Sequence, residues 1–256
     1  MELFTSSSKC KFVNLIHRIR SKFNRKNCMS WVTKTLSSTL GRKLIMALTG
    51  LFLILFLTGH VSGNLLLFQS DGGQAFNIYA KFMTTNPAVK LLSYVTYISV
   101  IGHVIYSVFL TKVNKSARPV DYSTTKSSKN STTASRNMGI LGTVILVFLA
   151  GHMYTFWFQM HWGEVPLVTY EGEEYKNLYY VVSQAFQQEW MVGLYVVAMS
   201  FLGFHLSHGF ASAFQTLGLS HKKYSPAIEA LGKFYSILVP ILFASMPLYI
   251  YFTSQS

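Results

Sequence analysis

The 256-residue sequence has few charged residues and almost no cysteine. Charged residues make up 12% of the chain, whereas a soluble globular domain usually has about 25%. Only 9 residues are Asp or Glu, against 22 Lys and Arg. The two cysteines, Cys10 and Cys28, both lie near the N-terminus. This excludes a disulfide scaffold, a thiolate zinc site and an iron–sulfur cluster within this chain.

Charged residues are missing from five long stretches of the sequence. Each is close to the roughly 20 apolar residues that a helix needs to cross a bilayer. Lipid offers the backbone no hydrogen bonds, so helices are the expected form. The sequence therefore predicts an all-α membrane protein with five transmembrane helices, and two prolines in the fifth, Pro240 and Pro247, predict a kink there. The stretches are residues 44–67, 88–111, 138–160, 190–214 and 234–252, with Lys90 as their one charged residue.

The basic residues fall on alternate connections. The segment before the first span and residues 112–137 and 222–233 together hold 19 Lys and Arg, whereas residues 68–90 and 161–189 hold 3. Basic connections stay in the cytoplasm, so the N-terminus is expected inside and the C-terminus outside. The net charge of +13 is thus a topology signal, and no nucleic-acid partner is expected.

The first 35 residues differ in composition from residues 36–256, which we assign to the transmembrane domain. They are basic, and we expect a poorly ordered extension. They lack the 7–15-residue apolar run of a secretory signal. An organelle transit peptide, a cytoplasmic extension and a start codon upstream of Met29 all fit, and we favour the last two.

Histidines are the ionisable residues inside the spans, and such residues are functional candidates by default. With a helix rise of about 1.5 Å per residue, the histidines of spans one and three lie about 24 and 21 Å from the inner face. Those of spans two and four lie about 22 Å from the outer face. In a hydrocarbon core about 30 Å thick, this gives two levels about 14 Å apart. The span histidines are His60, His103, His152, His205 and His208.

Two histidines at each level, on different helices, are what six-coordinate haem requires, because its iron takes one axial nitrogen on each face. His205 matches the level of His103 better than His208 does. Gly59, Gly102 and Gly151 each precede a histidine and would let a helix or a flat macrocycle approach. No Cys-x-x-Cys-His segment occurs, so non-covalent haem is expected. A hydrogen-bonded core histidine, a proton relay or a transporter site are the alternative interpretations.

Four segments around these histidines resemble a known family. They are ALTGLFLILFLTGHVSGNLL, IGHVIYSVFLTK, LAGHMYTFWF and FHLSHGFASAFQTLG. In this order, on these spans, the chain resembles the membrane-anchor cytochrome b subunit of succinate dehydrogenase and fumarate reductase, of the single-chain, five-helix, dihaem type. The resemblance covers about residues 36–252.

The resemblance implies two haem b groups, a distal one held by His60 and His152 and a proximal one held by His103 and His205. His208 is the alternative fourth ligand, or a group beside the proximal haem. The family passes electrons between a cytoplasmic flavoprotein and iron–sulfur protein and membrane menaquinone, as part of succinate oxidation in the tricarboxylic acid cycle or of fumarate reduction. The implied location is the bacterial cytoplasmic membrane, in contact with lipid.

One feature departs from part of the family. Some quinol-oxidising members use a carboxylate near the distal haem, whereas the present spans contain no acid. No quinone-site residue and no direction of reaction are therefore assigned. Two other functions remain open: the cytochrome b subunit of a hydrogenase or formate dehydrogenase, and a histidine-lined proton or metal transporter. Transporters often contain repeated halves, and no such repeat is evident.

Overall fold

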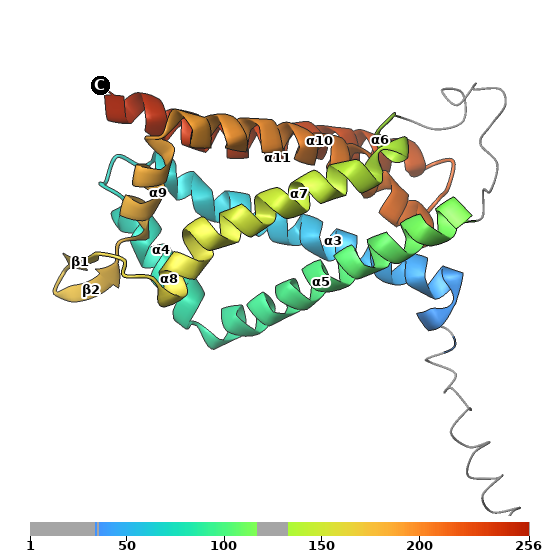
Figure 1. The fold of residues 1–256 in the computed structure, drawn as a ribbon, viewed down its shortest axis with the longest axis horizontal. Helices are drawn as coiled ribbons and strands as arrows, with labels where there is room; N and C mark the ends of the chain where they lie inside the picture. The colour runs from blue at the N-terminus through green and yellow to red at the C-terminus, as the bar shows by residue number, and fades with distance from the viewer. Residues whose placement is uncertain (1–33, 35, 117–132, 256) are drawn as a thin grey trace, which may run out of the picture. The chain divides into compact units, whose positions relative to one another are not determined.

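The computed structural model describes residues 34, 36–116 and 133–255 (Figure 1). The chain divides into two compact units, Met1–Arg42 and Lys43–Ser256, and the second contains every site discussed below. The expected basic extension, residues 1–35, lies outside the described residues except for Lys34.

Five long helices dominate the described residues, as the charge-free stretches predict. Each is long and apolar enough to cross a membrane, so the chain is an all-α, multi-pass membrane protein. The third span continues from its α-helix through a π-helical turn, η3 (Met153–Phe158), into α8 (Gln159–Trp162). The helices are α3 (Thr39–Asn64), α5 (Pro87–Ser116), α7 (Met138–His152), α10 (Glu189–Thr216) and α11 (Ser225–Gln255).

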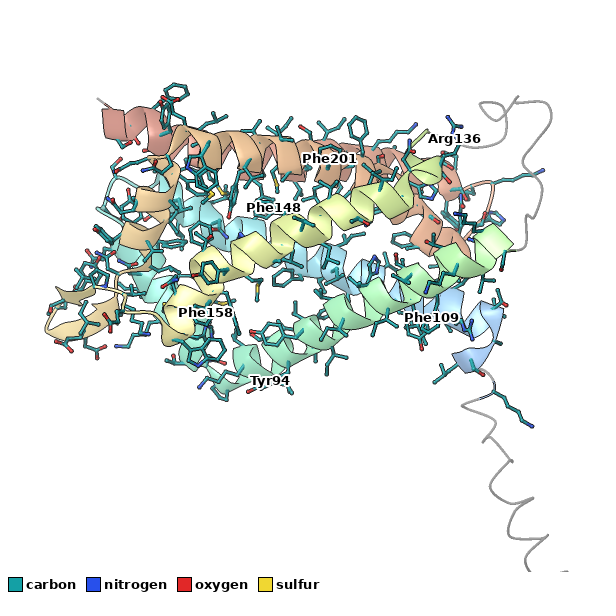
Figure 2. All side chains as sticks on the ribbon, in the orientation of Figure 1. Tyr94, Phe109, Arg136, Phe148, Phe158 and Phe201 are labelled. Atoms are coloured by element: carbon teal, nitrogen blue, oxygen red, sulfur yellow. The ribbon has the colours of Figure 1, made fainter. Side chains whose placement is uncertain are left out.

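The helices carry large apolar side chains on their outer surfaces, as Figure 2 shows along their length. Leu55 of α3, Ile98 of α5 and Val147 of α7 are 68%, 71% and 70% exposed. In water such surfaces would drive aggregation, whereas lipid covers them. The longest spans have 30 residues, or about 45 Å, which includes the headgroup regions as well as the hydrocarbon core.

The helix pair α10 and α11 forms the closest packing in the bundle. At Gly203 of α10, an added Cβ would lie 3.0 Å from the carbonyl oxygen of Ser236 and 3.6 Å from Cγ of Pro240, both on α11. Only glycine permits this approach. The helix α11 runs without interruption through Pro240 and Pro247, so the prolines do not end the fifth span.

The two long connections at one end of the bundle are ordered, and we call them the cap (Figure 1). The sequence predicted only loops here. The turn of the β-hairpin has Glu171 and Gly172 at φ 51° and 83°, the positive angles that a two-residue hairpin loop requires. A turn η1 (Leu65–Phe68) leads into the cap and a short helix α6 (Thr133–Arg136) precedes α7. The cap consists of α4 (Gln74–Thr85), β1 (Leu167–Tyr170), β2 (Glu173–Lys176) and α9 (Leu178–Phe186).

Asn77 joins the parts of the cap. Its side chain is fully buried. Its Nδ2 donates to the hydroxyl of Tyr170 and to Oδ1 of Asn177, each at 3.0 Å, and its Oδ1 accepts from the backbone N–H of Tyr179 at 2.9 Å. One amide thus links α4 to β1, to the N-cap of α9 and to the first turn of α9.

An ion pair on the cap surface adds a second link between α4 and the hairpin. Lys81 Nζ donates to Glu173 Oε2 at 3.0 Å and to the carbonyl oxygen of Glu174 at 3.3 Å. The hydrogen bond from Lys81 lowers the pKa of the Glu173 carboxyl, and the same bond raises the pKa of Lys81. Because both groups are exposed, this pair contributes little to stability.

We predict that Asn77→Ala loosens the cap. The substitution leaves the buried N–H of Tyr179 without its acceptor, which costs about 1–3 kcal/mol. Denaturation in detergent and limited proteolysis of residues 163–188 measure the effect. Asn137→Ala is the matched control, because Asn137 is exposed and its side chain makes no capping bond. Equal behaviour of the two variants would contradict the role given to Asn77.

Candidate functional site

The structure brings His60 and His152 together inside the bundle. His60 lies near the end of α3, and His152 is the last residue of α7. Their ring centroids are 5.8 Å apart and their planes are nearly perpendicular, at 88°. Two residues that lie 92 positions apart in the sequence, on different helices, therefore face each other.

His103 and His205 form a second pair, from α5 and α10. Their ring centroids are 6.2 Å apart, with an interplanar angle of 64°. Near this pair, two glycines on other helices come close. An added Cβ at Gly50 of α3 would lie 3.4 Å from Cε1 of His103, and one at Gly142 of α7 would lie 3.9 Å from Cε1 of His205. Four helices thus surround the second pair.

The two pairs lie at different levels along the bundle. On α3, His60 is 11 residues beyond Thr49, whose hydroxyl contacts His103. On α10, His205 is 10 residues beyond Tyr195, whose hydroxyl contacts His152. These spacings correspond to about 16.5 and 15 Å along a helix. The separations measured along α3 and α10 therefore agree closely with each other and with the 14 Å expected from the sequence.

Aromatic side chains enclose the His60–His152 pair. Phe56 stacks on His60 at 5.4 Å between centroids, and Phe243 of α11 lies 5.5 Å from the same ring. Phe156 lies 5.4 Å from His152, and Phe148, labelled in Figure 2, lies 5.9 Å from it. This surrounding surface offers the imidazoles no charge and excludes water.

Hydrogen bonds orient the ring of His103. The hydroxyl of Thr49 donates to the carbonyl oxygen of Ile45 at 2.8 Å. Its oxygen lies 3.2 Å from Nδ1 of His103. In the tautomer that carries the proton on Nδ1, the ring donates to this oxygen, and Nε2 is then the nitrogen available for a metal.

The Nδ1 atoms of the other three histidines have different surroundings. Nδ1 of His152 lies 3.1 Å from the hydroxyl of Tyr195. Nδ1 of His60 lies 3.4 Å from Nδ2 of Asn64, which also donates to the His60 carbonyl at 2.7 Å. Nδ1 of His205 is buried and has no hydrogen-bond partner among the described residues. The two pairs are thus alike in spacing and unlike in their hydrogen bonds.

A π-helical turn begins directly after His152. Such turns are rare and often occur at functional sites. Within this turn, Trp157 Nε1 donates to the hydroxyl of Tyr97 on α5 at 2.8 Å. The sequence predicts an uninterrupted span over these residues, and no pattern in it marks the π turn.

The remaining histidines take no part in either pair. His208 lies one turn beyond His205 on α10 and is partly buried, and no ring contact joins it to His103 in the part of the chain that the structure describes. His161 packs on Trp157 at 4.6 Å, and His221 lies beside Tyr224. The third histidine outside the spans, His17, lies outside the described residues.

The glycines beside the histidines make no close contact with another helix. At Gly59 and Gly151 an added Cβ would meet no atom within 4 Å, and at Gly102 it would meet only Cγ2 of Thr49 at 3.9 Å. That these glycines admit a flat macrocycle stays a prediction. Two other glycines, Gly50 and Gly142, lie close to the rings of His103 and His205.

The donor set of each pair suits haem. Each pair offers two imidazole donors from different helices, and haem iron can take two such ligands from a protein. Metal–imidazole bonds of about 2 Å place two axial rings with their centroids about 6 Å apart. The observed separations of 5.8 and 6.2 Å fit that requirement.

The sequence pointed to the four histidines but missed the residues that support them. Asn64 lies four residues after His60 and could have been found by helical spacing. Thr49 and Tyr195 lie on other helices, and only the register between helices reveals them. Comparisons with protein-family models, curated proteins and solved structures give no match to this chain.

We predict that His205→Ala lowers the haem content of the purified protein by half, whereas His208→Ala leaves it unchanged. His205 faces His103, and His208 does not. Pyridine haemochrome assay against protein concentration measures the ratio. Full haem content in His205→Ala together with loss in His208→Ala would reverse the choice of ligand.

Proposed function

We propose that the chain is a dihaem cytochrome b of the membrane, with His60 and His152 holding one haem and His103 and His205 holding the other. The observation that carries this proposal is the pairing of four imidazoles from four helices at two levels. Two functions of the protein follow from its residues: it positions each pair of rings, and it keeps water from them.

The residues around each pair serve these two functions. The hydroxyls of Thr49 and Tyr195 hold the rings of His103 and His152. Phe56, Phe148 and Phe243 form an apolar wall around the first pair. When bound, haem supplies a one-electron redox centre whose potential depends on axial ligation, hydrogen bonding and burial.

The resemblance supports a more specific proposal, that the chain anchors a succinate:quinone oxidoreductase. A cytoplasmic flavoprotein and an iron–sulfur protein would exchange electrons with membrane quinone, menaquinone by the resemblance, through this chain. The distribution of charge supports a docking face for such partners. Exposed basic residues occupy the ends of helices away from the cap: Lys112 and Lys115 on α5, Arg136 on α6, and Lys222, Lys223 and Lys233 around the start of α11.

The cap has the opposite character. Glu171, Glu173 and Glu174 are exposed on the hairpin, and Lys81 is bound to Glu173. By the positive-inside rule, the cap then faces outward and the basic end faces the cytoplasm. In that orientation the His103–His205 pair lies nearer the cytoplasm and the His60–His152 pair nearer the cap.

The test of the cytochrome proposal is a reduced-minus-oxidised spectrum of the purified chain, with single variants of the four histidines. His60→Ala and His152→Ala should each remove one b-type signal, and His103→Ala and His205→Ala the other. Size-exclusion chromatography in detergent shows whether each variant is folded. A well-folded wild-type protein without b-type haem would refute the proposal and favour a histidine-lined proton or metal path.

The partner proposal has a separate test. Mild solubilisation of native membranes and purification through this chain should recover a flavoprotein and an iron–sulfur protein with succinate:quinone or quinol:fumarate activity. Recovery of a hydrogenase or formate dehydrogenase subunit would replace the partner and leave the haem assignment in place.

A further inference from the structure

The hydroxyl of Tyr195 lies deep in the bundle and has one described partner, the ring of His152. Tyr195 is 8% exposed. Its oxygen lies 3.1 Å from Nδ1 of His152. Which of the two groups donates depends on the tautomer of His152, and in either case the contact orients both the phenol and the imidazole.

The packing around the Tyr195 ring leaves it little freedom. Phe148 of α7 and Phe186 of α9 lie 4.8 and 4.9 Å from it, both in edge contacts. Phe156 of the π turn lies 6.2 Å away. Side chains of α7, of the π turn and of the cap helix α9 therefore contact the phenol from different sides.

The four histidines differ in what lies next to their Nδ1 atoms. Nδ1 of His152 faces a phenol on a neighbouring helix, and Nδ1 of His103 faces a threonine hydroxyl. Nδ1 of His60 faces an amide nitrogen at the weak distance of 3.4 Å, and Nδ1 of His205 faces no partner among the described residues. Hydrogen bonds to the outer nitrogen of a ligating histidine fix its orientation and raise its basicity.

From these observations, and resting on the proposed function, we infer that Tyr195 is a positioning residue that sets the redox potential of the haem at His60 and His152 and of that haem alone. A histidine that binds iron through Nε2 carries its proton on Nδ1. The phenol oxygen of Tyr195 then accepts that proton's hydrogen bond. The imidazole becomes a stronger electron donor, which stabilises the ferric state.

The direction of the effect follows from this argument. Tyr195→Phe keeps the ring and its contacts with Phe148, Phe186 and Phe156, and removes only the acceptor. His152 becomes a weaker donor, so the ferric haem loses stability relative to the ferrous haem. The potential of this haem should rise, and that of the haem at His103 and His205 should stay unchanged.

A redox titration of the purified wild-type and variant proteins tests the inference. The two haem signals are assigned beforehand from His60→Ala and His103→Ala. Loss of the hydrogen-bond partner of a ligating histidine, at the ring nitrogen that does not bind the metal, typically changes metal affinity 10–100-fold. A tenfold change in the relative affinity for the two oxidation states corresponds to about 59 mV for one electron, and we expect an upward shift of this size.

Tyr235→Phe is the matched control. Its hydroxyl donates to the carbonyl oxygen of Ile54 at 2.7 Å and lies 3.0 Å from the hydroxyl of Thr58. It is an intramembrane phenol that contacts no histidine of either pair, so both potentials should remain at their wild-type values in this variant.

The outcomes separate the inference from the proposed function. A rise confined to the haem at His60 and His152 in Tyr195→Phe, with none in Tyr235→Phe, supports the inference. Two haems with unchanged potentials in Tyr195→Phe, or an equal shift of both, overturn it and leave the proposed function standing. A wild-type protein without haem overturns both.

Discussion

The cost of placing imidazoles within a bilayer governs this structure. A polar ring facing lipid has no hydrogen-bond partner, and the bundle removes that exposure by turning its histidines toward each other. His60 and His152 meet at 5.8 Å, and His103 and His205 at 6.2 Å. Because the two histidines of each pair come from different helices, formation of the pair fixes the register between those two helices. The same arrangement places two imidazole rings about 6 Å apart in each pair, and the haem proposal rests on this pairing.

The two pairs are not equivalent, and their differences arise from the helices around them. Aromatic rings enclose the His60–His152 pair, and the hydroxyl of Tyr195 lies within hydrogen-bond distance of His152. The His103–His205 pair instead lies against Gly50 and Gly142, with one outer nitrogen bonded to Thr49 and the other unpartnered among the described residues. If each pair holds a haem, as we propose, these different surroundings should give the two haems different potentials.

Much of this architecture could be predicted from the sequence, because lipid imposes simple rules. The charge-free stretches predicted all five spans, and counting residues along a helix gave the two levels of histidine. The cap could not be predicted in the same way, since it depends on Asn77, a polar residue buried by contacts from segments about 100 residues away. The π turn after His152 and the roles of Thr49 and Tyr195 depend on side-chain register between helices, which periodicity within one helix does not encode.

Our proposal that each histidine pair holds one haem is tested by the molar ratio of haem b to protein in the purified wild-type chain, with protein quantified by amino-acid analysis. Two haems per chain are expected. A ratio of one would mean that only one pair binds haem, and a ratio of zero in folded protein would refute the proposal.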